Sequence, residues 1–280
     1  MTDAKNKNPN ELPDDEELPA PLRPRRKGIY ILPNAITLAA LFSGFYAIVM
    51  AMNGRFELAC IAIFCAAVLD SLDGRVARMT NAQSAFGEQM DSLSDMVSFG
   101  AAPALIVYIW AFKDMGKLGW IPSFVYISGA ALRLARFNVN IGVVDKRFFQ
   151  GLPSPAAAAI VIGMIWAFDD AGLRQVTNLP WVVWTAFGLT LFAGLSMVTN
   201  APFYSFKVVG ARRTVPFVVL VAIALAIALI SQNPPIGLFA IFCAYGLSGY
   251  VVYGYKRMKG KPVSVIATST DEPDEQGLHR

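Results

Sequence analysis

The chain has 280 residues, of which 55% are apolar, 16% are charged and only one is a histidine. Of the 24 Lys and Arg and 20 Asp and Glu residues, 12 lie within residues 1–27 and 9 within 256–280, so 23 remain for the 228 residues between. That is about one residue in ten, against about a quarter in soluble domains, which excludes a soluble globular fold. The lone His279 argues against histidine base catalysis, and three cysteines in apolar runs indicate neither a disulfide framework nor a zinc site.

Eight apolar runs are long enough to cross a bilayer as helices, which takes about 20 residues each. These runs cover residues 35–53, 56–74, 93–112, 119–137, 153–169, 180–200, 215–231 and 235–255. The third can begin as early as Ser84, before its apolar part. A membrane barrel would alternate polar and apolar residues, and these runs do not. We therefore predict an all-α fold, a polytopic membrane helix bundle of about eight spans.

Lysines and arginines fall mostly on one side of this bundle. With the N-terminus inside, 20 of the 24 lie on the inner side, and the outer side keeps only Arg55, Lys113, Lys117 and Arg174. Cytoplasmic loops retain such an excess, so we expect a multi-pass protein of the cell membrane with both termini in the cytoplasm. Because the cations are spread over separate membrane-edge loops, we expect no nucleic-acid partner.

Three parts follow from this division of charge. Residues 1–27 form a polar tail that ends in a basic cluster, residues 28–255 form the membrane domain, and residues 256–280 form a second polar tail. Both tails lack apolar periodicity and contain prolines, so we expect them to be disordered.

Residues 69–99 carry acidic side chains inside predicted spans. An Asp near the bilayer centre costs about 2.5–3.5 kcal/mol on insertion scales, so a group of them indicates a functional site. Two sets of residues recur at intervals of three or four, which places each set on one face of a helix. The first set is Asp70, Asp73, Gly74, Ala77 and Arg78, and the second is Gly87, Asp91 and Asp95. If the two helices are antiparallel, these faces meet and four carboxylates share one pocket.

Four carboxylates in one pocket need countercharge, because like charges disfavour each other's ionised form. Oxygen ligands select Mg²⁺, Mn²⁺ or Ca²⁺, and four acidic groups suit two such ions. A pair of divalent ions is also what stabilises the transition state of phosphoryl transfer. Gly74 and Gly87 leave room for a bulky ligand, and Arg78 could hold a phosphate.

Two other readings of these residues are available. Asp91 could pair with Arg78, and Asp73 with Arg75, only to make membrane insertion tolerable, which leaves two carboxylates and both glycines unexplained. Intramembrane carboxylates also mark the ion pathways of cation-coupled transporters. A transporter predicts acidic residues scattered over several helices, whereas this chain concentrates them in one pair.

The two sets together read D-x2-D-G-x2-A-R-x8-G-x3-D-x3-D, which resembles the complete signature of the CDP-alcohol phosphotransferases. These are integral membrane enzymes that transfer a phosphatidyl or similar group from a CDP-linked donor to an alcohol and release CMP. Three further segments resemble the phosphatidylserine synthase branch of this family: LPNAITLAALFSGFYAI at 32–48, ALRLARFN at 131–138 and GLPSPAAAA at 151–159. The last four helices resemble that branch more loosely.

The resemblance implies roles for the signature residues. Asp70, Asp73 and Asp91 would hold two divalent cations, Mg²⁺ or Mn²⁺, and Asp95 would contact one of them and act as the general base. The CDP-lipid donor would be bound by Asn34, Thr37, Gly74, Arg78 and Ser84.

The acceptor implied by this branch is the hydroxyl of L-serine, and glycerol 3-phosphate, inositol phosphate and choline remain alternatives. Arg133 and Arg136 could take the carboxylate of an amino acid, while Asn138, Gln150 and Ser154 could read its ammonium and hydroxyl groups. The two arginines could instead mark a helix end on the cytoplasmic side. We expect CDP-diacylglycerol, L-serine, membrane lipids and a second copy of the chain as partners, with the active site at the cytoplasmic side.

Overall fold

The computed structural model describes residues 31–80, 82–139, 148–173, 179–204, 228 and 230–259. The predicted tail 1–27, most of the tail 256–280 and nearly all of the predicted span 215–231 lie outside these ranges.

Helices make up nearly all of the described chain, and their order is as follows. The elements are α1 (Ile31–Met52), α2 (Phe56–Met79), α3 (Ala85–Asp95), the π-helical η2 (Met96–Ala101), α4 (Ala102–Val107), the π-helical η3 (Tyr108–Phe112), the short η4 (Gly116–Leu118), α5 (Trp120–Val139), β1 (Phe148–Gln150), α6 (Ser154–Asp170), α7 (Pro180–Val198), β2 (Pro202–Tyr204) and α9 (Pro234–Met258).

The predicted helical class is confirmed, with one addition. Within the described ranges, helices occupy the first six predicted spans and the eighth. The third helix starts at the earliest position predicted for it, because Ser84 caps α3. Helical segments then continue to Phe112. The addition is a pair of three-residue strands, in which β1 and β2 run antiparallel.

Five helices in the described part of the chain are long and apolar enough to cross a membrane. They are Ile31–Met52, Ala85–Phe112, Gly116–Val139, Pro180–Val198 and Pro234–Met258. α2 carries Asp70, Asp73 and Arg78 of the signature, and α6 has only 17 residues. The chain is therefore a membrane protein, and the count of eight spans stays a prediction.

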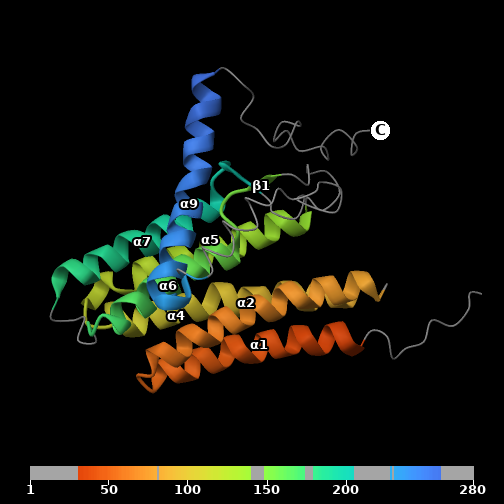
Figure 1. The fold of residues 1–280 in the computed structure, drawn as a ribbon, viewed down its shortest axis with the longest axis horizontal. Coiled ribbons are helices and arrows are strands. Elements are labelled where there is room, and N and C mark those ends of the chain that lie inside the picture. Colours follow the sequence, from red (N-terminus) through yellow and green to blue (C-terminus); the bar gives the residue numbers. More distant parts are fainter. Residues whose placement is uncertain are drawn as a thin grey trace, which may run out of the picture.

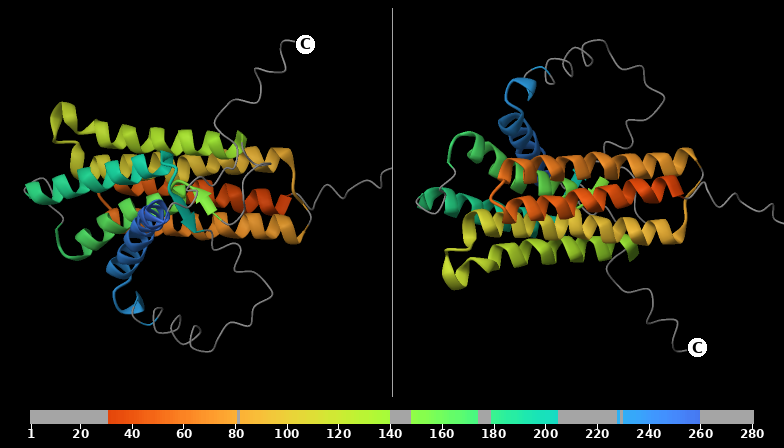
Figure 2. Two further views of the ribbon diagram at one scale, coloured as in Figure 1. Left: turned by 90° about the horizontal axis from the view of Figure 1, so that it is seen from above. Right: turned by 90° about the horizontal axis from the view of Figure 1, so that it is seen from below.

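α6 is the central helix of the bundle. Every residue from Ala156 to Ile165 is buried, and α2, α7 and α9 pack around this helix. α1 and α2 lie side by side along the bundle, whereas α9 crosses it at a steep angle (Figures 1 and 2). A helix buried on all sides needs apolar residues on all sides, which explains why α6 reads as a continuous apolar run.

α1 fixes the position of the helix that carries Asp91 and Asp95. The hydroxyls of Ser94 and Ser98 donate to the α1 carbonyls of Thr37 (3.3 Å) and Ala40 (3.2 Å). Gly44 lets the helices come this close, since a Cβ there would lie 2.5 Å from Ser98 Oγ and 2.8 Å from Ser98 Cα. The small residues and hydroxyls at this crossing are those that membrane helices use for close packing.

A π-helical segment follows directly after Asp95. π-helical turns, in which each backbone hydrogen bond spans five residues instead of four, are rare and are frequently found at functional sites. Within this segment the carbonyl of Phe99 accepts a hydrogen bond from the buried Tyr126 hydroxyl of α5 at 2.9 Å. This bond ties α5 to the helix of Asp95.

We predict that Gly44→Ala destabilises the protein by about 1–3 kcal/mol, because the new methyl group would overlap the Ser98 backbone. The matched control is Gly188→Ala in α7, where a Cβ meets no atom within 4 Å. Thermal unfolding in detergent micelles measures both. Equal melting temperatures for Gly44→Ala and the wild type would contradict the close α1 packing.

Candidate active site

Three carboxylates from two helices converge at one point. Asp70 comes from α2, while Asp91 and Asp95 come from α3, and each offers an oxygen that lies within 4.8 Å of the other two. The spacing along each helix produces this arrangement, because residues four apart occupy the same face. The structure thus brings together three of the four carboxylates for which the sequence predicts one pocket, while Asp73 is not part of this group and lines the adjoining cavity.

The chemistry of this cluster fits a divalent cation. The carboxyl groups of Asp70 and Asp95 approach within hydrogen-bonding reach, which two carboxylates do only when a proton or a cation offsets their repulsion. One oxygen of Asp95 and one of Asp73 are buried without a hydrogen-bond partner. An oxygen-only donor set is what Mg²⁺ and Mn²⁺ prefer, so the cluster could hold such an ion.

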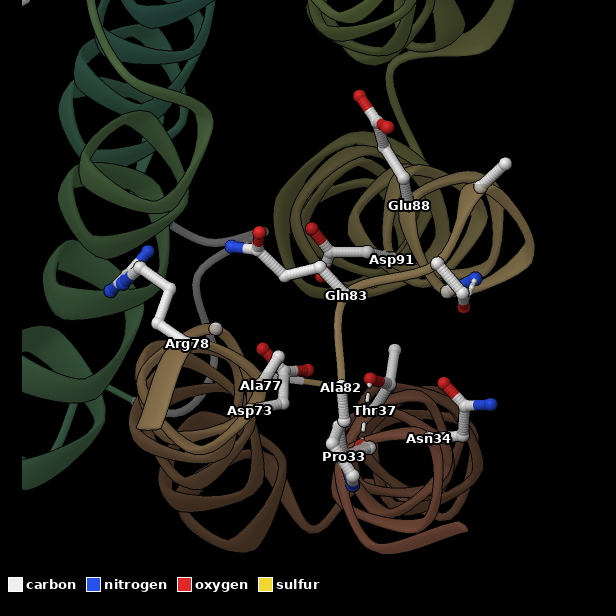
Figure 3. Close-up of a pocket in the computed structure, with 14 residues that line it drawn as sticks. Pro33, Asn34, Thr37, Asp73, Ala77, Arg78, Ala82, Gln83, Glu88 and Asp91 are labelled. Atoms are coloured by element: carbon white, nitrogen blue, oxygen red, sulfur yellow. Dashed lines mark hydrogen bonds between the residues drawn. The ribbon is translucent and has the colours of Figure 1, made fainter. Parts of the chain in front are cut away.

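A cavity of about 510 Å³ opens beside the cluster. Its wall is built from α1, α2, the connection after α2 and the start of α3, and the side chains of Asp73 and Asp91 face it from two sides (Figure 3). Its lining residues are Pro33, Asn34, Thr37, Asp73, Gly74, Ala77, Arg78, Ala82, Gln83, Ser84, Ala85, Gly87, Glu88 and Asp91. All five residues predicted for the donor therefore line this one cavity.

The two glycines keep the cavity open in different ways. At Gly74 a Cβ would meet only Arg78 Nη1, at 3.7 Å, so the backbone there faces open space. At Gly87 a Cβ would lie 3.2 Å from both Asn34 Oδ1 and Ser84 Oγ. Ser84 Oγ in turn accepts a hydrogen bond from the Gly87 N–H at 3.0 Å, which caps α3.

On the other side of Asp95 lies a buried arginine. Arg133 of α5 interacts electrostatically with Asp95 and donates from Nη1 to Ser154 Oγ at 2.8 Å. Its Nε is buried without a hydrogen-bond partner. A buried guanidinium with a donor left over can bind an anion next to Asp95. Arg133 and Ser154, two of the predicted acceptor residues, are thus brought together.

The other three predicted acceptor residues bond elsewhere. Asn138 exchanges hydrogen bonds with Ser92 of α3, at 3.1 and 3.3 Å. Arg136 and Gln150 both donate to Asn200 Oδ1, at 3.1 and 2.8 Å. Asn138 therefore remains next to the acidic helix, while Arg136 and Gln150 connect to the end of α7.

A sequence model of one family matches this part of the chain. The CDP-alcohol phosphatidyltransferase model covers residues 30–192, which include the whole carboxylate cluster and the cavity. The chain belongs to the CDP-alcohol phosphatidyltransferase family. The resemblance inferred from the signature is confirmed.

Three curated proteins are similar to between 46% and 80% of the chain. The CDP-diacylglycerol–serine O-phosphatidyltransferase of Helicobacter pylori strain J99 is 33% identical over 224 residues, which cover 80% of this chain and 92% of that protein. The enzyme of the same name from Saccharomyces cerevisiae is 41% identical over 147 residues, 47% of this chain and 52% of that protein. The archaetidylserine synthase of Methanothermobacter thermautotrophicus is 39% identical over 132 residues, 46% of this chain and 55% of that protein.

Several residues of this CDP-alcohol phosphatidyltransferase site were not found from the sequence. Gln83 and Glu88 line the cavity, Ser92 binds Asn138, and Asn200 binds Arg136 and Gln150. Glu88 lies three residues before Asp91 and Ser92 lies three residues before Asp95, so the helical period could have indicated both. Asn200 carries no such signal, because its partners are 50 and 64 residues away.

We predict that Asp91→Asn weakens Mn²⁺ binding by at least about tenfold, because it removes one of the three converging carboxylates. Glu88→Gln is the matched control, since Glu88 lies on the same helix and lines the cavity but is not part of the cluster. Titration of Mn²⁺ followed by electron paramagnetic resonance gives both affinities. Wild-type affinity in Asp91→Asn would show that the ion binds elsewhere.

Proposed function

We propose that this protein transfers the phosphatidyl group of CDP-diacylglycerol to the hydroxyl of L-serine, giving phosphatidylserine and CMP. The observation that carries the proposal is the position of Asp95. Asp95 belongs to the carboxylate cluster beside the cavity and also interacts with Arg133, which donates a hydrogen bond to Ser154. The names of the three relatives support serine, because each describes the synthesis of a serine phospholipid.

The donor nucleotide occupies the cavity in this proposal. Asn34, Thr37 and Ser84 offer amide and hydroxyl groups at its wall, and Arg78 offers a guanidinium for the diphosphate. The open space over Gly74 lets the diphosphate approach the backbone. Asp70, Asp73, Asp91 and Asp95 would hold two divalent cations, Mg²⁺ or Mn²⁺. When bound, these ions would stabilise negative charge on the phosphate oxygens.

Asp95 acts as the general base. It takes the proton from the acceptor hydroxyl, and the hydroxyl oxygen forms a bond to the phosphorus that carries diacylglycerol. The bond from that phosphorus to the oxygen of CMP breaks, and CMP leaves with the electron pair. No histidine or covalent nucleophile is required, because positioning and charge stabilisation account for the catalysis.

Arg133 and Ser154 bind the acceptor. The free Nε of Arg133 pairs with the serine carboxylate, which places the serine hydroxyl toward Asp95. Asn138, which is hydrogen-bonded to Ser92 of α3, binds the ammonium group of serine. Glycerol 3-phosphate and inositol phosphate are anions as well, so an acceptor trial has to include them.

We further propose that the site faces the cytoplasm, since Lys and Arg are in excess on that side, and that the protein works as a homodimer. The cation-coupled transporter finds no support in the described residues. Their acidic cluster is confined to α2 and α3 and adjoins a cavity sized for a ligand.

The proposal predicts CMP release from CDP-diacylglycerol in mixed micelles with Mg²⁺ or Mn²⁺ when serine is present. Asp95→Asn should lower kcat by about 10²- to 10⁴-fold, because the base is lost. The assay is run in parallel with glycerol 3-phosphate, inositol phosphate and choline. CMP release with one of these alcohols but not with serine would show that serine is not the acceptor. Full activity of Asp95→Asn would show that Asp95 is not the general base.

We predict that Arg133→Met raises the KM for serine by about 10- to 100-fold, as expected for the loss of a charge-assisted hydrogen bond, and leaves the KM for CDP-diacylglycerol unchanged. Arg75→Met is the matched control, since Arg75 is exposed on α2 and does not line the cavity. Initial rates at varied serine measure both variants. An unchanged serine KM in Arg133→Met would exclude this arginine from the acceptor site.

A further inference from the structure

Asn200 joins three elements at one end of the bundle. It follows α7, and its Oδ1 accepts hydrogen bonds from Arg136 Nη1 of α5 (3.1 Å) and from Gln150 Nε2 of β1 (2.8 Å). Asn200 lies beyond residue 192, where the family match ends. The family signature therefore gives no role to this residue.

Arg136 makes further hydrogen bonds at the end of α7. Besides Asn200, its Nη2 donates to the carbonyl of Val198 at 3.1 Å, and it reaches that of Met197 at 3.5 Å. These carbonyls are at the C-terminus of α7, where the helix dipole favours a cation. The guanidinium thus caps α7 and fixes the C-terminal part of α5 against it.

The segment that leads into α6 is fixed to the same place. Gly151 has a φ of +80° and donates its N–H to the carbonyl of Ala201 at 3.0 Å. The N–H of Leu152 donates to the carbonyl of Ser196 at 2.9 Å. Any Cβ on Gly151 would press on the carbonyl oxygens of Met197 and Thr199. With the Gln150–Asn200 bond, this segment has little freedom to move relative to α7.

These ties converge on the acceptor side of the site. Arg133 lies one turn before Arg136 on α5, and Ser154 is the first residue of α6. The Arg133–Ser154 hydrogen bond therefore joins the two segments that Asn200 holds together. A change at Asn200 would alter the separation of Arg133 from Ser154 without touching the carboxylate cluster.

We propose that Asn200 is a positioning residue for the acceptor: through Arg136 and Gln150 it sets the Arg133–Ser154 pair beside Asp95. This proposal rests on one part of the proposed function, namely that Arg133 and Ser154 bind the acceptor. It changes the roles expected for Arg136 and Gln150, which hold the site in shape instead of contacting the substrate.

The test compares Asn200→Leu with Asn200→Asp. Leucine has a similar size and no acceptor, whereas aspartate keeps an oxygen that both donors can use. Asn200→Leu should raise the KM for serine roughly tenfold, the effect of about one lost hydrogen bond, with kcat and the KM for CDP-diacylglycerol nearly unchanged. Asn200→Asp should restore the serine KM to within about twofold of the wild type.

Tyr250→Phe is the matched control. The Tyr250 hydroxyl donates to Ser196 Oγ at 2.7 Å, so this variant removes a short hydrogen bond from the same end of α7 and spares the Asn200 bonds. It should keep the wild-type serine KM. Gln150→Met provides a second variant at the surface in case Asn200→Leu folds poorly. It should raise the serine KM too, and when combined with Asn200→Leu the two effects should not add.

A wild-type serine KM in Asn200→Leu would overturn the proposal. The proposal would also be overturned if Asn200→Leu lowered kcat as much as it raised the KM for serine and also lowered the melting temperature, and if Asn200→Asp restored none of these. That is the pattern of a purely structural residue. If the wild type transfers to another alcohol and not to serine, the proposed function fails while the same variants, assayed by the KM for that alcohol, still test Asn200.

Discussion

The repulsion between Asp70, Asp91 and Asp95 is the constraint on which the rest of this structure depends. Three carboxylates whose oxygens lie within 4.8 Å of one another in an apolar helix bundle are unstable without countercharge. Among the described residues, Arg133 is the cation that interacts with Asp95. A proton or a cation must therefore offset this repulsion, and the oxygen-only cluster could hold a divalent cation.

Much of the bundle keeps the two acidic faces in place. α1 packs against both α2 and α3, with Gly44 and two serine hydroxyls allowing and fixing the close approach. Tyr126 then ties α5 to the π-helical turn after Asp95, which brings Arg133 to the site. Contacts between the helices thus decide where Asp95, the other two carboxylates and Arg133 lie relative to one another.

The sequence predicted the parts of the site that repeat with the helical period. Asp70, Asp91 and Asp95 could be placed together because residues three or four apart share a face, and charge stands out in an apolar run. Only the family resemblance predicted that Asn34, Thr37 and Ser84 bind the donor, and all three line the cavity. For Arg136 and Gln150 the residue type suggested an acceptor contact, while their hydrogen bonds go to Asn200.

What the sequence did not predict depends on contacts between distant segments or on subtle backbone changes. Asn200 meets partners from two other elements at an irregular helix end, where no periodicity exists. The π-helical turn after Asp95 leaves the hydropathy pattern unaltered, so no local signal marks it. The pairing of β1 with β2 involves three residues on each side, too few to show an alternating pattern.

The most direct test of the cation-dependent site is the location of Mn²⁺ by anomalous X-ray scattering in crystals grown with CMP. The account predicts anomalous density in contact with the carboxylates of Asp70, Asp91 and Asp95, at the edge of the cavity that also holds the nucleotide. Nucleotide bound in that cavity, with no anomalous density at any of the three carboxylates, would contradict it.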